Sequence, residues 1–80
     1  MANNKLYSVI SRVLGVPEED ISDDTSPDTV KTWDSLSHVN LIIALEHQFG
    51  VHLSPEEAME MESVKLIRLT LADHGIEFNG

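Results

Sequence analysis

Trp33-Asp34-Ser35-Leu36-Ser37-His38-Val39 is the stretch at which a polar segment ends and the longest apolar-periodic run of the chain begins. Asp34 is a suitable helix N-cap, because its carboxylate can accept hydrogen bonds from backbone N–H groups two or three residues further on. Ser35 would then lie in the first turn, where unpaired N–H groups and the positive end of the helix dipole favour a bound phosphate. Ser35 is therefore the candidate functional residue, although a serine at this position can also be a purely structural first-turn residue.

The run that follows predicts a helix over residues 35–49, which Gly50 ends. At about 100° per residue, its apolar side chains fall on two nearly opposite sides of the helix. One side can face the core, and the other is either buried under a neighbouring element or exposed as a docking patch. The position of the second side next to Ser35 favours docking. The first side consists of Leu41, Ile42, Leu45 and Phe49, and the second of Leu36, Val39 and Ile43.

The segment before this stretch predicts a first helix, because its apolar residues recur at helical spacing. Asn3 or Asn4 can cap its start, and Gly15 followed by Pro17 ends it. The apolar stripe consists of Leu6, Val9, Ile10, Val13 and Leu14.

Two more helices are predicted after the run. Ser54-Pro55-Glu56-Glu57 is typical of a helix start, with a serine cap, a proline in the first turn and a glutamate three residues after the cap. This helix is short and ends near Met61. A last helix starts at Ser63, ends at Gly75 and has an apolar stripe of Val64, Ile67 and Leu71, with Leu66 beside them. There is no strand signal of any length, so the predicted fold is all-α: a small bundle of three principal helices plus one short helix.

The connection from Pro17 to about Trp33 is acidic and longer than most links in a compact domain, and such loops usually have a function. Ile21 is expected to anchor its middle to the core. Asp20, Ser22 and Asp24 alternate as in a calcium-binding loop, but Thr25 stands where the sharp-turn glycine belongs and Lys31 where the bidentate glutamate belongs. We therefore reject an EF-hand and predict no metal site, leaving only weak cation binding by the acidic loop open.

Length and composition restrict the number of domains and the kinds of site that the protein can have. Eighty residues with 41% hydrophobic and 24% charged residues are typical of one globular domain, which we take as residues 1–80. The absence of cysteine excludes disulfides and thiolate sites. No apolar run approaches a membrane span and no signal peptide is found, so we expect a cytoplasmic protein without membrane insertion.

The net charge of −9, from fourteen acids against five bases, argues against nucleic acid as a partner, because phosphate backbones would be repelled. The same charge can steer the protein toward basic surfaces of other proteins or simply keep it soluble. We expect a monomer.

No catalytic constellation is visible. The four histidines are not paired at metal-ligand spacing on one helix face. Ser35 and His38 could be read as nucleophile and base, but side chains three residues apart on a helix rarely form the aligned hydrogen bond that a base needs, and no third orienting group is present. We therefore expect no enzymatic activity, and the remaining functional interpretation of Ser35 is a covalent attachment point.

The chain resembles the acyl carrier protein family. The resemblance is carried by Asp34-Ser35-Leu36, Val39, Leu41-Ile42-Ile43-Ala44-Leu45-Glu46, Phe49-Gly50-Val51 and Glu56-Glu57-Ala58, and the helical layout, length and acidity extend it over nearly the whole chain. It implies that Ser35, flanked by Asp34 and Leu36, carries 4′-phosphopantetheine added from coenzyme A by a phosphopantetheinyl transferase. The terminal thiol would hold acyl groups as thioesters.

The resemblance also implies partners and a cargo site. Acyl-loading and acyl-processing enzymes would dock on residues of the second and short helices, and an acyl chain would lodge in the bundle near Leu45 and Met61. The implied docking residues are Leu36, Val39, Ile43, Glu46, Glu56 and Glu57.

The sequence differs from the fatty-acid members at two places. Lys31-Thr32 replaces the usual Leu-Gly, and usually acidic positions of the second helix hold Ser37, Asn40, His47 and Gln48. These differences point away from housekeeping fatty-acid synthesis and resemble a specialised stand-alone carrier for natural-product or cell-surface chemistry. The function that the resemblance implies is delivery of acyl intermediates to partner enzymes in fatty-acid, polyketide or related specialised biosynthesis. Two alternatives stay open: an aminoacyl or peptidyl carrier protein, and a small acidic helical interaction module without a prosthetic group.

Overall fold

The computed structural model describes residues 2–76 and confirms the predicted all-α fold of three principal helices and one short helix. No strand occurs within this range. Besides the four α-helices, one 3-10 helix, η1, lies in the long connection. The elements are α1 (Ala2–Leu14), η1 (Glu18–Asp20), α2 (Ser35–Phe49), α3 (Pro55–Glu60) and α4 (Val64–Asp73).

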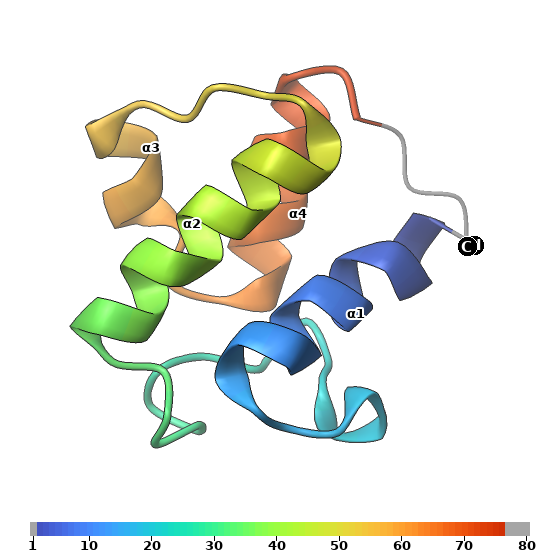
Figure 1. Cartoon of the computed structure of the whole chain (residues 1–80), viewed down its shortest axis with the longest axis vertical. Helices are drawn as coiled ribbons and strands as arrows, with labels where there is room; N and C mark the ends of the chain where they lie inside the picture. The colour runs from blue at the N-terminus through green and yellow to red at the C-terminus, as the bar shows by residue number, and fades with distance from the viewer. Residues whose placement is uncertain (1, 77–80) are drawn as a thin grey trace.

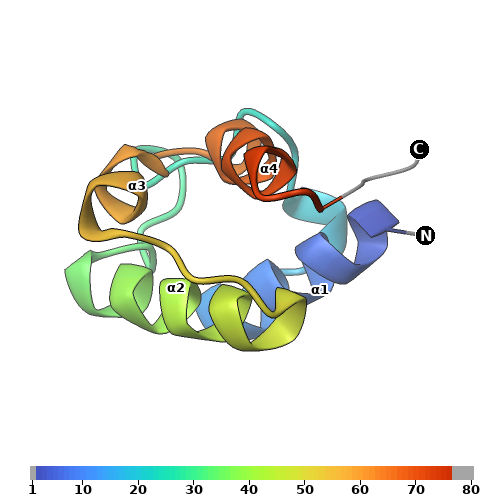
Figure 2. The ribbon, with the colours of Figure 1, turned by 90° about the horizontal axis from the view of Figure 1, so that it is seen from above.

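The helices surround one core (Figures 1 and 2). α1 packs against α2, and these two helices form one side of the bundle, with α3 and α4 on the other side. The connection between α1 and α2 passes beneath the bundle in the view of Figure 1, so the start of α2 lies at the edge where this connection ends.

The core takes side chains from α1, α2 and α4 and from the segments between the helices. The predicted stripes of α1 and α4 are largely confirmed, but Leu66 of α4 is exposed, so its place in the stripe was wrong. Leu66 follows Val64 by two residues, which on a helix points its side chain away from the face that Val64 and Ile67 bury. The buried apolar residues are Leu6, Val9, Ile10, Leu14, Ile21, Trp33, Leu41, Leu45, Leu53, Met61, Val64, Ile67 and Leu71.

The start of α1 differs from the prediction. The helix already begins at Ala2, so Asn3 and Asn4 lie inside it and neither is its N-cap. Its end is as predicted: Gly15 has a positive φ of 72°, and its N–H donates to the Ser11 carbonyl at 2.8 Å.

The long connection is tied to the helices on both sides. Ile21 is buried, as predicted. The Val64 N–H at the start of α4 donates to the Thr25 carbonyl at 2.9 Å, and the guanidinium of Arg68, in the middle of α4, lies 2.6 Å from the Asp23 carboxylate. Near its other end, the Thr32 hydroxyl donates to the Leu14 carbonyl at 2.7 Å. These contacts fix the connection, and therefore the position at which α2 begins.

The predicted capping groups set the bounds of α2 and α3. Gly50 ends α2 with φ 66° and ψ 37°, a left-handed conformation that costs glycine little, and the Val51 N–H donates back to the Glu46 carbonyl at 3.2 Å. Ser54 and Glu57 form a complete capping box at the start of α3, with Pro55 in the first turn.

Candidate functional site

Asp34 caps α2 as the sequence predicts. Its backbone is extended, with φ −108° and ψ −172°, and its Oδ1 accepts from the Ser37 N–H at 2.9 Å. The hydrogen bonds from the Ser37 backbone N–H and hydroxyl lower the pKa of the Asp34 carboxyl below its ordinary value. Asp34 is therefore ionised at neutral pH and holds the first turn of α2 in place.

Ser35 is the first residue of α2, and its side chain is exposed. The helix is 15 residues long, so its N-terminus presents unpaired amides and the positive end of a substantial dipole. A hollow of about 440 Å³ opens beside Ser35, between the start of α2 and the end of α3. An exposed hydroxyl at a helix N-terminus, with free space next to it, fits a covalently attached phosphate ester.

His38 does not act on Ser35, because both of its ring nitrogens have other partners. Its Nδ1 accepts from the Trp33 indole N–H at 3.0 Å, which places the proton of a neutral ring on Nε2; this nitrogen donates to the Ala58 carbonyl at 2.7 Å. The two rings are also stacked, with centroids 6.2 Å apart and planes 21° apart. We call Trp33, His38 and the Ala58 carbonyl the indole–imidazole bridge; it joins the start of α2 to α3.

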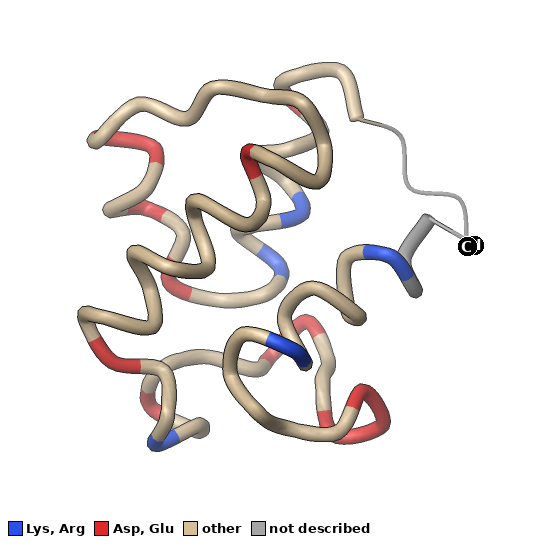
Figure 3. The backbone as a smooth tube through the Cα atoms, in the orientation of Figure 1, with Lys and Arg blue, Asp and Glu red and all other residues tan. Residues whose placement is uncertain are grey.

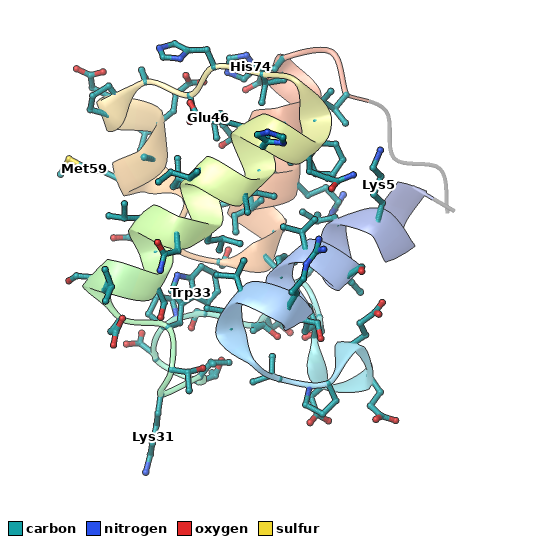
Figure 4. All side chains as sticks on the ribbon, viewed as in Figure 1. Lys5, Lys31, Trp33, Glu46, Met59 and His74 are labelled. Carbon is teal, nitrogen blue, oxygen red and sulfur yellow. The ribbon has the colours of Figure 1, made fainter. Side chains whose placement is uncertain are left out.

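Sequence reasoning missed this bridge. The sequence did contain one signal, a tryptophan within a polar segment. Such a large apolar side chain is seldom left in water, and Trp33 is only 3% exposed. Figure 4 shows Trp33 beside the first turns of α2.

The two apolar sides of α2 are separated largely as predicted, although Ile42 and Phe49 of the core side are only half-buried against the core. Leu41 and Leu45 are fully buried, whereas Leu36, Val39 and Ile43 are 71%, 55% and 57% exposed. Met59 of α3, which no sequence pattern indicated, is 76% exposed. Its side chain points away from the bundle in Figure 4. The structure therefore leaves an apolar surface on α2 next to Ser35.

Two of the acids expected at a docking surface form hydrogen bonds within the chain. The Glu46 Oε2 accepts from the Leu53 N–H at 2.8 Å and so holds the link between α2 and α3. Glu57 accepts from the Ser54 N–H at 3.0 Å through Oε1, and its Oε2 lies 2.7 Å from the His74 Nε2. These contacts, first of all the backbone hydrogen bond from Ser54, lower the pKa of the Glu57 carboxyl. Glu56, by contrast, is exposed.

Charge is unevenly distributed over the site (Figure 3). Glu46 is the one acidic residue within α2, and Asp34 directly precedes the helix, whereas three of the six residues of α3 are acidic. Within residues 2–76, no group of three or more histidine, aspartate or glutamate side chains could hold a metal ion. The same part of the chain contains no helix long and apolar enough to cross a membrane.

Leu45 and Met61, near the implied cargo position, are both fully buried. Neither residue lines the hollow beside Ser35 or a second hollow in the long connection. The second hollow, of about 470 Å³, lies within the long connection between Val16 and Thr32.

A family model for the phosphopantetheine attachment site matches residues 4–71. The chain belongs to this family. It is a carrier protein of the acyl carrier protein family, and its domain is the site of covalent 4′-phosphopantetheine attachment. Carrier domains of this kind are carriers rather than catalysts, and they interact with phosphopantetheinyl transferases and biosynthetic enzymes. Ser35 and its surroundings fit this carrier function: the hydroxyl is exposed, the helix start favours a phosphate, and the apolar surface lies beside it.

Proposed function

We propose that Ser35 is the attachment residue and that the protein, as one carrier domain of residues 1–80, holds acyl intermediates as thioesters for fatty-acid, polyketide or related specialised biosynthesis. The observation that carries this proposal is the position of Ser35: the exposed first residue of α2, directly after the Asp34 cap. In the modification, the Ser35 Oγ forms a phosphoester bond with the phosphopantetheine half of coenzyme A, the nucleotide half leaves, and the serine proton passes to the transferase.

Each part of the chain has a separate task in this proposal. Asp34 holds the first turn through the Ser37 N–H, and the helix N-terminus stabilises the negative charge of the phosphoester. The thiol at the end of the attached group supplies the thioester chemistry. Ser35 provides only the anchor, because His38 is committed to Trp33 and Ala58 and gives Ser35 no base for chemistry of its own.

We propose that partner enzymes dock on the exposed apolar side of α2, formed by Leu36, Val39 and Ile43. A well-buried apolar side chain contributes about 1.5–3 kcal/mol, whereas an exposed ion pair contributes about 0–1 kcal/mol. The carboxylates of Glu46 and Glu57 accept hydrogen bonds from backbone N–H groups of the same chain, so they contribute less to docking. Glu56 is exposed and is therefore the better placed acid for a basic partner. We further propose that the carrier is cytoplasmic and monomeric.

Incubation with coenzyme A and a phosphopantetheinyl transferase tests the attachment residue. Intact-mass spectrometry should show the addition of one phosphopantetheine group, and Ser35→Ala should abolish it without loss of helicity. Ser37→Ala is the matched control, since it removes a second hydroxyl from the same turn while keeping the backbone N–H that Asp34 binds. Modification that persists in Ser35→Ala would refute the assignment.

Mass spectrometry of the protein purified from its own host tests the carrier function itself. A phosphopantetheine group, with or without an acyl or aminoacyl thioester, is the expected result, and the mass of the thioester identifies the cargo. Protein that is entirely unmodified in its host would favour the interaction module.

A further inference from the structure

The position of α3 depends little on packing. The helix has six residues, none of them buried, and a helix of this length is not stable by itself. Leu53 and Met61, which precede and follow it, are buried and anchor the chain on either side of the helix. Figure 2 shows α3 at the edge of the bundle, between α2 and α4. The orientation of α3 therefore depends on polar contacts that its own residues make with these two helices.

One such contact lies toward each end of α3. Near its start, the Glu57 carboxylate lies 2.7 Å from the Nε2 of His74, at the end of α4. Toward its other end, the Ala58 carbonyl accepts from the Nε2 of His38, on α2, at 2.7 Å. This carbonyl belongs to the last turn, where carbonyls lack a donor four residues on, and its contact with the Met61 N–H is longer, at 3.3 Å. His38 thus supplies a donor that α3 does not provide equally well.

We propose that His38 is a positioning residue: it fixes α3 beside the start of α2, and the transferase that modifies Ser35 recognises the surface formed by the two helices in this arrangement. The inference rests on the proposed modification of Ser35. His38 takes no part in the chemistry, because its two ring nitrogens are paired with Trp33 and Ala58. It acts on recognition through α3.

Trp33 sets the direction of the contact. An indole N–H can only donate, so the His38 Nδ1 that faces it at 3.0 Å accepts, and the proton of the neutral ring is on Nε2. This nitrogen is then a donor, which matches a backbone carbonyl that can only accept. Because Trp33 is buried, its indole holds the imidazole in one tautomer and one orientation.

The surface that depends on α3 lies close to Ser35. Met59 directly follows Ala58, is mostly exposed, and borders the same hollow as Ser35. Glu56, about one turn earlier on α3, is exposed as well. An enzyme that reaches the Ser35 hydroxyl therefore meets side chains of α3 in addition to those of α2. A displaced α3 would remove part of this contact surface without changing the start of α2.

Steady-state kinetics of a phosphopantetheinyl transferase, with coenzyme A saturating and the carrier varied, test the inference at a temperature at which circular dichroism shows every variant to be folded. In His38→Leu the KM for the carrier should rise about threefold or more, because the apparent affinity falls with the population that has α3 in place. The kcat should not change, since the Asp34 cap of α2 is retained. His38→Gln should keep the KM near the parent value, because its amide offers an acceptor to Trp33 and a donor to Ala58.

A double variant separates positioning from stability. Trp33→Phe combined with His38→Leu leaves no indole donor unpaired, so it should be more stable than His38→Leu, yet it lacks the donor for Ala58 and should show the same raised KM. His47→Leu is the matched control. His47 is exposed on the same helix, about 18 Å along its axis from Ser35, and its replacement should leave the KM unchanged.

Amide hydrogen exchange measures the position of α3 without the transferase. The Ala58 and Met61 amides, which bond within and just after α3, should exchange about threefold faster or more in His38→Leu and at the parent rate in His38→Gln.

Three results would overturn the inference and leave the proposed function intact: a parent-like KM in the double variant, a KM in His38→Gln as high as in His38→Leu, or α3 amides that exchange equally in His38→Leu and the parent protein. Failure of the transferase to modify the parent protein would instead overturn the proposed function and, with it, the role of His38 in recognition. Amide exchange would then still decide whether His38 holds α3 in place.

Discussion

Removal of the His38 imidazole tests the indole–imidazole bridge most directly. In His38→Leu a side chain of similar size replaces the imidazole, but the Trp33 N–H loses the acceptor that it has at 3.0 Å. Because Trp33 is 3% exposed, this donor is left buried and unpaired, which costs about 1–3 kcal/mol. The Ala58 carbonyl loses less, since it also accepts from the Met61 N–H at 3.3 Å. For a domain of this size, the expected decrease in the melting temperature is about 5–20 °C.

A double-mutant cycle with Trp33→Phe separates the hydrogen bond from packing. Trp33→Phe removes the donor, so adding His38→Leu to it leaves no buried N–H unpaired and should cost much less than His38→Leu alone. Urea unfolding followed by circular dichroism gives the four free energies, and we expect a coupling energy of about 0.5–3 kcal/mol. If the losses in unfolding free energy of the two single variants add up to that of the double variant within about 0.5 kcal/mol, the bridge contributes nothing and the reasoning is refuted.

Three further results are expected. Ile43→Ala should weaken docking of the holo form to its cognate enzyme more than Glu46→Gln does, because Gln keeps an oxygen that can accept from the Leu53 N–H. The measurement is the affinity of each variant for that enzyme at low and at physiological salt. A larger effect of Glu46→Gln, or loss of most of the affinity in salt, would indicate electrostatic recognition. Added salt or divalent cation should raise the unfolding midpoint by screening the net charge of −9, and a midpoint indifferent to both would show that the acids are compensated within the fold. The pKa values of the Asp34 and Glu57 carboxyls are lowered in the folded protein from their ordinary values of 3.8 and 4.5. Each carboxylate therefore stabilises the fold fully at a pH above its ordinary pKa, and this stabilisation is lost as the pH falls through the lowered pKa. Acid unfolding of a variant with Asp34→Asn and Glu57→Gln should therefore depend less on pH in this range, and an unchanged pH dependence would contradict the assignment.

The sequence by itself determined the predicted bounds of α2 and the attachment candidate, because the groups that set them are local. The Asp34 carboxylate binds an N–H three residues on, Gly50 supplies the left-handed turn at the end of the same helix, and Ser54 and Glu57 cap each other across three residues. Such contacts depend on spacing along the chain, which the sequence contains in full. Where local groups were ambiguous, as at Asn3 and Asn4, the predicted boundary was wrong.

Periodicity alone separated two apolar sides of α2 without saying what covers either; the position of Ser35 favoured exposure of one side, and the tertiary structure established it. The tertiary structure also decided the surroundings of Ser35: the contact from His38 to Ala58 spans 20 residues and that from Asp23 to Arg68 spans 45. From the sequence, Glu46 and Glu57 were expected to lie at a docking surface. Folding instead brings the Leu53 N–H within hydrogen-bonding distance of Glu46, and the His74 ring within hydrogen-bonding distance of Glu57. Contacts between distant segments form only when the core brings those segments together, and this is the physical reason that the hollow beside Ser35 could not be predicted from residue spacing.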